Sequence, residues 1–236
     1  MRPIALAVTL LALGTACASA QGPPPPYVQS AEARRPEPPS PEAVPGKWRL
    51  AFIDVETTGL VPGWHEMIDI GIAMTDVDGR VLDTLFLRSQ PRHPERLSPG
   101  ARAVNAFDAA RWKTLGALTP EAAVDSILAF HGRVAGSRPT LMVAFNSQFD
   151  AAFLDHLFRM RGSSWREMYH YFVLDLPSMA WSLGLRDLRG NLLAERLGVP
   201  DEPHVAVQHT GITGAMVNVR IYQALMRLRA TRPSPP

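Results

Sequence analysis

The sequence predicts an α/β fold in which a mixed five-stranded sheet is flanked by helices. Five apolar segments have the length and composition of strands: residues 49–56, 67–74, 81–87, 141–145 and 173–175. The first three follow one another before any long helical pattern, and Asp78-Gly79 marks a hairpin between the second and the third. A helix is predicted from Pro120 to about Val134, before the fourth strand. Consecutive strands favour an antiparallel half-sheet, which helix-linked strands then extend.

Length and composition indicate one sizeable globular domain with short extensions. The chain has 236 residues, of which 46% are hydrophobic, an ordinary value for a protein with a buried core. The formal net charge is only +2, and among the 24 basic residues only Lys47 and Lys113 are lysines. Arginine is suited to bidentate phosphate contacts, but a biased genome explains the same composition. Charge alone therefore does not identify a nucleic-acid-binding protein.

Residues 1–20 have the pattern of a secretory signal peptide. A basic start precedes an apolar run over residues 4–13, and Ala18-Ser19-Ala20 supplies small residues for cleavage. The apolar run is too short to span a bilayer comfortably. An alternative makes Cys17 a lipid-modified residue, because residues 14–17 resemble a lipobox, although Gly14 stands where leucine is usual. Both predict export, to a bacterial periplasm, to its envelope through a lipid anchor, or into the medium.

Residues 21–46 are rich in proline and predict a disordered linker. Four prolines stand in a row at 23–26 and others follow up to Pro45, so neither a helix nor a paired strand is expected there. Such a stretch would act as a semi-extended tether, with docking of a protein partner as the alternative. The folded domain is predicted over residues 47–230, and residues 231–236 as a disordered tail.

Two carboxylates close the first strand. Asp54 and Glu56 are separated by one residue, and the period of a strand points both side chains to the same face. A turn follows at once through Thr57, Thr58 and Gly59. A solvated acidic edge is the alternative, but Asp and Glu are poor strand formers. The pair is therefore a candidate clamp for a divalent metal ion.

The segment from Asp54 to Leu60, with the sequence DVETTGL, resembles the first motif of the DEDDh family of 3′–5′ exonucleases. Members of that family collect acidic ligands from three separated motifs. The resemblance implies a ribonuclease H-like fold, which the predicted order of strands and helices matches. It also implies that Thr57, Thr58, Gly59 and Leu60 contact the substrate.

The second motif follows the fourth strand. Asn146, three further residues and Asp150 precede an apolar helix, which is similar to the second signature of the family. Asp150 lies near the first turn of that helix, where free N–H groups favour an anion. Helix capping is the alternative role for Asp150. The resemblance further implies that Asn146 and Phe149 contact the substrate.

The third motif departs from the family. His204 and Ala206 match, but His209 stands where the family carries its final aspartate. Asp201 and Glu202 precede the histidine, so neither replaces that aspartate without a shift in register. The resemblance spans about residues 48–228, with three of the four carboxylates present.

The resemblance implies a site with two divalent metal ions, Mg²⁺ or Mn²⁺. Asp54 would bridge the ions, Glu56 would bind the ion that activates water, and Asp150 would bind on the leaving-group side. His204 would be the general base, because imidazole titrates near neutral pH. His209 would be a metal ligand, and its nitrogen suits Mn²⁺ or Zn²⁺ better than Mg²⁺, which prefers oxygen.

Three functions are compatible with these motifs. The first is a 3′–5′ exonuclease that acts on the 3′ ends of single-stranded DNA or RNA with altered use of metal ions. The second is an inactive module that binds nucleic acid, and the third is an exported interaction domain, because a fold does not determine function. Salt-dependent binding of single strands distinguishes the second from the third. The sequence predicts neither the oligomeric state nor the choice between DNA and RNA.

Overall fold

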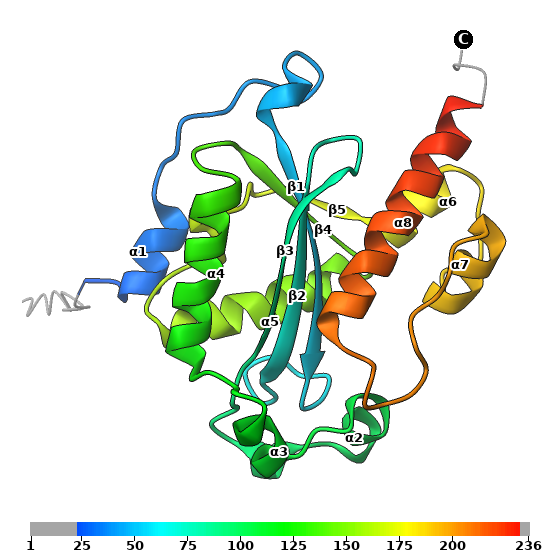
Figure 1. Ribbon diagram of the computed structural model, residues 1–236. Coiled ribbons are helices and arrows are strands. Elements are labelled where there is room, and N and C mark those ends of the chain that lie inside the picture. Colours follow the sequence, from blue (N-terminus) through cyan, green and yellow to red (C-terminus); the bar gives the residue numbers. More distant parts are fainter. Residues whose placement is uncertain (1–22, 232–236) are drawn as a thin grey trace, which may run out of the picture.

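A five-stranded sheet in the order β3-β2-β1-β4-β5 forms the centre of the computed structural model, which describes residues 23–231 (Figure 1). The strands are β1 (Arg49–Thr57), β2 (Met67–Thr75), β3 (Val81–Arg88), β4 (Thr140–Ala144) and β5 (Val173–Asp175). Neighbours β1, β2 and β3 are antiparallel, whereas β4 is parallel to both β1 and β5. The predicted mixed α/β sheet is therefore confirmed.

Helices cover both faces of the sheet (Figure 1). The α-helices are α1 (Pro26–Glu32), α2 (Pro99–Asn105), α3 (Ala109–Thr114), α4 (Pro120–Val134), α5 (Ser147–Met160), α6 (Leu176–Ser182), α7 (Gly190–Leu197) and α8 (Gly211–Ala230). Three 3₁₀ turns are η1 (Pro45–Lys47), η2 (Pro94–Arg96) and η3 (Trp165–Glu167). One apolar core lies between the sheet and α4 and α5, and a second lies under α6, α7 and α8.

The alternation of β1 assigns its residues to these two cores. Ile53 and Val55 belong to the core under α4 and α5, whereas Phe52 belongs to the core under α8. Continuing the period of two, Asp54 and Glu56 point to the α8 side of the sheet. Because Phe52 pairs with Val143 in the parallel ladder, the ends of β1 and β4 lie next to each other.

Helix α8 lies unusually close to β1 and β2. A methyl group added at Gly71 would overlap the backbone of Gly211 and Ile212, and one added at Gly214 would overlap the Asp54 carboxylate. Asn218 on the same helix donates a 3.2 Å hydrogen bond to the Ile53 carbonyl. The absence of side chains at the glycines therefore allows α8 to approach the acidic end of β1.

The prediction that the proline-rich segment holds no helix is wrong. Residues 26–32 form α1, although no helix was predicted between 21 and 46. Pro26 occupies the first turn, where its missing N–H costs nothing, and this position was not considered in the prediction. The helix packs against η3: Ser30 donates a hydrogen bond to Glu167, and Arg166 donates one of 3.2 Å to the Ala31 carbonyl.

The predicted signal peptide and Cys17 lie outside the described residues, as do residues 232–236. Within residues 23–231, no helix combines the length and the apolar character that a membrane crossing requires.

We expect Gly71→Ala to destabilise the protein by about 1–3 kcal/mol, because the new methyl group would overlap backbone atoms of α8. Chemical denaturation measures this change. The matched control is Gly132→Ala, at an exposed position of α4 where a methyl group meets nothing within 4 Å. That control should raise the unfolding free energy by up to about 1 kcal/mol, because alanine favours helix. Equal effects of the two substitutions would contradict the close packing of α8.

Candidate active site

Three carboxylates meet where β1 and β4 end. Asp54 and Glu56 come from β1, and Asp150 comes from the first turn of α5. The Asp150 Oδ1 atom accepts a 3.1 Å hydrogen bond from the Val55 backbone N–H, which lies between the two acidic residues of β1. Glu56 and Asp150 are only 6% and 2% exposed. The strand and the helix therefore bring the buried Glu56 and Asp150 and the half-buried Asp54 to one junction.

The environment opposes ionisation of Asp54 and Asp150. Burial raises the pKa of Asp54 well above its ordinary value, and the charges of Asp150 and Glu56 raise it further. Burial likewise raises the pKa of Asp150, although the hydrogen bond from Val55 acts in the opposite direction. The junction thus concentrates negative charge that a cation would stabilise.

His209 lies between two carboxylates. Its Nε2 is 3.0 Å from Oε1 of Glu56, and its Nδ1 is 3.3 Å from Oε2 of Glu202. The hydrogen bond with Glu56 and the charge of Glu202 raise the pKa of His209 to about 9. Glu202 precedes His204 in the sequence and is not expected at the site, but the loop from residue 201 to 209 folds back and places Glu202 beside the cluster. Nothing in the local sequence signals this contact.

Asn105 is a second residue of the site that is not among the predicted site residues. The last residue of α2, it is 3% exposed and donates hydrogen bonds of 3.3 Å to Oε2 of Glu56 and 3.0 Å to the Thr57 carbonyl. Its own Oδ1 accepts from the Phe107 N–H, across Ala106 with a φ of 50°. Asn105 therefore fixes the orientation of the Glu56 carboxylate. The signal was present as an asparagine inside an otherwise apolar stretch.

Asp69 is the third such residue. It is completely buried in β2, directly opposite Glu56, and accepts a 2.9 Å hydrogen bond from the N–H of Gly211 at the start of α8. Burial raises its pKa to about 7, against the effect of that hydrogen bond. Asp69 holds the amino end of α8, which immediately follows His209. An aspartate in a strand buried on both faces was the available signal.

His204, the predicted general base, pairs with an acid outside the carboxylate cluster. Its side chain is 76% exposed, and its Nε2 is 3.3 Å from Oδ2 of Asp201 on the same loop. Within residues 23–231, no ion pair joins His204 to Asp54, Glu56 or Asp150. Its role in proton transfer therefore stays a prediction.

The predicted substrate-binding residues separate into two groups. Thr58 is fully buried; its Oγ1 accepts a hydrogen bond from the Glu66 N–H, and its carbonyl accepts one from Ser98. These contacts hold Thr58 within the turn, and its contact with a substrate stays a prediction. Thr57 also bonds within the turn, donating to the Gly59 carbonyl at 2.6 Å. Leu60, by contrast, is 79% exposed beside the turn.

In the second motif, Asn146 begins α5 in the left-handed region, with a φ of 63°, and its side chain makes no capping hydrogen bond. Ser147 donates its N–H to Asp175 instead, at 3.0 Å. The exposed Asn146 side chain is thus available to a ligand, whereas the half-buried Phe149 packs against Phe153, with ring centroids 4.8 Å apart.

The carboxylate oxygens of the cluster are of the ligand type that a divalent cation prefers. Asp54, Glu56 and Asp150 offer oxygen ligands, and burial, with a smaller effect from the neighbouring carboxylates, raises the pKa values of Asp54 and Asp150. Their spacing is not that of a closed site: in residues 23–231, no group of three or more His, Cys, Asp or Glu side chains is arranged to hold a metal ion. One Glu56 oxygen is engaged by His209.

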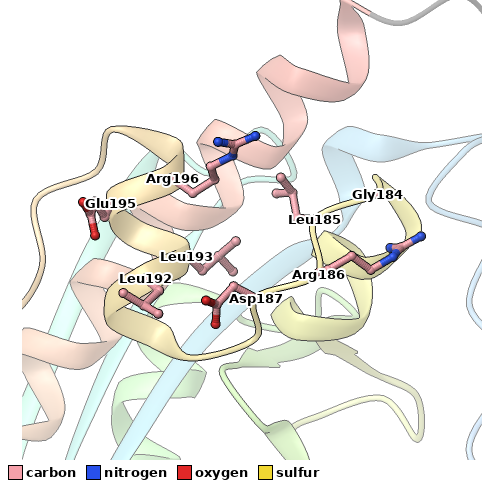
Figure 2. A pocket seen from close by; sticks show the side chains of 8 residues that line it. All are labelled: Gly184, Leu185, Arg186, Asp187, Leu192, Leu193, Glu195 and Arg196. Carbon is pink, nitrogen blue, oxygen red and sulfur yellow. The ribbon is translucent and has the colours of Figure 1, made fainter.

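A cavity of about 670 Å³ lies away from these acids, between the loop after α6 and helix α7 (Figure 2). Leu185 and Arg196 face each other across it, whereas Arg186 points outward in Figure 2. Its lining contains none of the residues of the carboxylate cluster, so it does not mark the candidate active site.

We expect the imidazole of His209 to titrate near pH 9 in metal-free buffer, as measured by NMR of its ring protons. Since the folded-state pKa is raised, the ion pair stabilises the protein fully below the ordinary pKa of about 6.5 and is lost as the pH rises through about 9, a contribution of roughly 3 kcal/mol. Glu56→Gln should lower the pKa of His209. The control Glu95→Gln, which alters a carboxylate beside His93, should leave it unchanged.

No protein-family model and no curated protein sequence matches the chain. Among solved structures, the zinc-bound E. coli ExoI–ssDNA complex matches with 16% identity and a TM-score of 0.63, over 78% of this chain and 41% of that chain. E. coli Exonuclease I with a dT13 oligonucleotide matches with 14% identity and a TM-score of 0.64, over 77% and 42%. The nuclease domain of 3′hExo, a DEDDh family member, bound to rAMP, matches with 13% identity and a TM-score of 0.62, over 78% and 92%.

The chain thus spans less than half the length of the Exonuclease I chains and nearly all of the 3′hExo nuclease domain. At these identities the likeness concerns the fold, and it confirms that this chain has the ribonuclease H-like α/β fold found in those exonucleases.

Proposed function

We propose that the chain is a metal-dependent 3′–5′ exonuclease that hydrolyses phosphodiester bonds at the 3′ end of single-stranded DNA or RNA. The observation that carries this function is the buried junction of Asp54, Glu56 and Asp150 at the ends of two parallel strands. Buried acids are normally paired with cations or N–H groups. Glu56 and Asp150 have such partners, but within residues 23–231 the Asp54 carboxylate has no hydrogen bond or ion pair. The fold shared with Exonuclease I and 3′hExo supports the same function.

Asp54, Glu56 and Asp150 would hold two divalent ions, Mg²⁺ or Mn²⁺. When bound, such ions stabilise negative charge on the attacking and leaving oxygens of a phosphodiester displacement. The protein supplies the arrangement of ligands. Val55 fixes Asp150 through its N–H, and Asn105 fixes Glu56, so both carboxylates are oriented before a substrate arrives.

His204 would accept the proton of the attacking water. Its exposure on the loop leaves the imidazole free to reach a bound substrate, and Asp201, 3.3 Å away, can orient the ring. His209 contributes differently, because both of its ring nitrogens already face carboxylates. It would keep Glu56 and Glu202 together when metal ions are absent.

The turn after β1 would receive the end of the nucleic acid. Leu60 and Trp64 expose apolar surface in this turn, at 79% and 56%, and the guanidinium of Arg96 lies 4.1 Å from the centre of the Trp64 ring. Apolar and aromatic side chains stack on bases without selecting a sequence. Asn146 would donate its amide on the other side of the cluster. A single strand therefore suits this surface.

Binding of single strands without hydrolysis is the second candidate function. The observation that favours it is the contact between His209 and Glu56, which engages an oxygen that a metal ion would need. Export of the protein is a separate proposal that rests on residues 1–20 alone, with cleavage after Ala20 and lipidation of Cys17 as its two forms.

Activity with end-labelled oligonucleotides tests the proposed function. Wild-type protein should shorten single strands from the 3′ end in Mn²⁺ and more slowly in Mg²⁺. Asp54→Ala should reduce the rate about 1,000-fold with either ion, because it removes the shared ligand. The control Glu95→Gln, at an exposed carboxylate of η2, should retain full activity.

His209→Asp separates the two candidate functions. If hydrolysis depends on metal ions at this cluster, the substitution should raise the Mg²⁺-dependent rate about tenfold or more, because it frees Glu56 and adds an oxygen ligand. Inert wild-type and His209→Asp proteins that still bind single strands would support the binding module. Failure to bind either metal ions or single strands would exclude both functions.

A further inference from the structure

Residues 33–39, here called the N-terminal strap, cross the edge of the domain between two anchors. At one end, Arg166 donates a hydrogen bond to the Ala31 carbonyl in the last turn of α1. At the other end, the Trp48 indole N–H donates a 2.8 Å hydrogen bond to the Pro39 carbonyl. The strap forms no helix or strand between these anchors. The strap is therefore an irregular segment on the surface of the domain that is fixed at both of its ends.

A cavity of about 490 Å³ lies beneath the strap. Its wall is formed by the strap from Arg35 to Pro39, by the end of α4 and the segment leading into β4, and by η3 with the residues that follow it. Thr140 begins β4, whereas the carboxylate cluster follows the other end of that strand. The two sites are thus at opposite ends of the sheet. The volume is within the range of small-molecule sites.

Three buried polar groups in the cavity wall have no hydrogen-bond partner among the protein atoms of residues 23–231. They are the hydroxyl of Tyr169, a residue that is 3% exposed, Nδ1 of His131, a residue that is 8% exposed, and Nε of Arg166. The two rings meet edge to face, with centroids 5.5 Å apart. Burial lowers the pKa of His131 to about 4, so its ring is neutral and can donate or accept. Unpaired buried groups of this kind are rare in packed cores and typical of ligand sites.

The cavity wall also carries arginines without carboxylate partners. Arg35, Arg138 and Arg166 each donate to a backbone carbonyl, of Ser30, Ala135 and Ala31 respectively. None of the three takes part in an ion pair within the described part of the chain. Of the two acids in the wall, Glu37 is exposed, and Glu167 already accepts hydrogen bonds from Ser30 and Ser163. The cavity is therefore lined by available guanidinium donors.

We propose that this cavity binds a small phosphate monoester with an attached ring, such as a nucleoside monophosphate. A phosphate dianion offers three acceptor oxygens, which matches several guanidinium groups better than a carboxylate does. Pro36, Pro38 and Met168 supply an apolar wall for a flat ring, and Tyr169 and His131 supply polar groups at its edge. Binding here requires neither hydrolysis nor the carboxylate cluster.

Calorimetric titration of the full chain with AMP in EDTA tests the site. Wild-type protein should bind AMP, and adenosine and inorganic phosphate should each bind at least about tenfold more weakly, because each lacks half of the ligand. Arg138→Gln, at an exposed position outside α1 and its anchors, should weaken AMP binding about tenfold without lowering the melting temperature. Tyr169→Phe should weaken binding while leaving the fold at least as stable, since it removes an unpaired buried hydroxyl.

Two controls locate the bound nucleotide. Asp54→Asn alters the carboxylate cluster, and Arg186→Gln alters the 670 Å³ cavity near α7; both should leave AMP binding unchanged. In NMR spectra, AMP should shift the backbone amides of Gly136 and Ser137. Three results would overturn the site: no binding of AMP by the wild type, equal binding by Arg138→Gln, or loss of binding in Asp54→Asn. If inorganic phosphate bound as tightly as AMP, the proposal that the ligand carries a ring would be wrong.

Discussion

Repulsion among buried carboxylates is the constraint on which the candidate active site depends. Asp54, Glu56 and Asp150 share a junction with little access to water, and burial together with mutual repulsion raises the pKa values of Asp54 and Asp150. The surrounding protein offers donors to these acids in return: the Val55 N–H, the Asn105 amide and the His209 ring. Gathering acids in this way lowers the folding stability of the protein, and such a local cost is characteristic of a functional site.

The close approach of α8 gives this junction its shape. Because Gly71, Gly211 and Gly214 have no side chains, the start of the helix lies directly on β1 and β2. Asp69 then fixes the first turn through the Gly211 N–H, and the residue two positions earlier, His209, reaches Glu56. The packing of an entire helix is thus coupled to the position of one imidazole. A substitution at Gly71 in β2 would therefore also shift the position of the His209 ring relative to Glu56.

Local pattern was sufficient to predict much of this fold. The strands follow from apolar runs, and Pro120 to Val134 forms the predicted helix because proline suits a first turn. The same property of proline was overlooked at Pro26, where α1 begins. Glu202 could not be placed from the sequence, because its contact with His209 arises only when the loop from residue 201 to 209 folds back. Local patterns carry no information about such pairings.

The histidine at position 209 sets the electrostatic balance beside Glu56. With its raised pKa, the ring carries a positive charge at neutral pH and lies between Glu56 and Glu202. An aspartate at the same place would add a third negative charge to this row and leave all of them to be neutralised by bound ions. The histidine therefore offsets the charges of Glu56 and Glu202 in the folded protein.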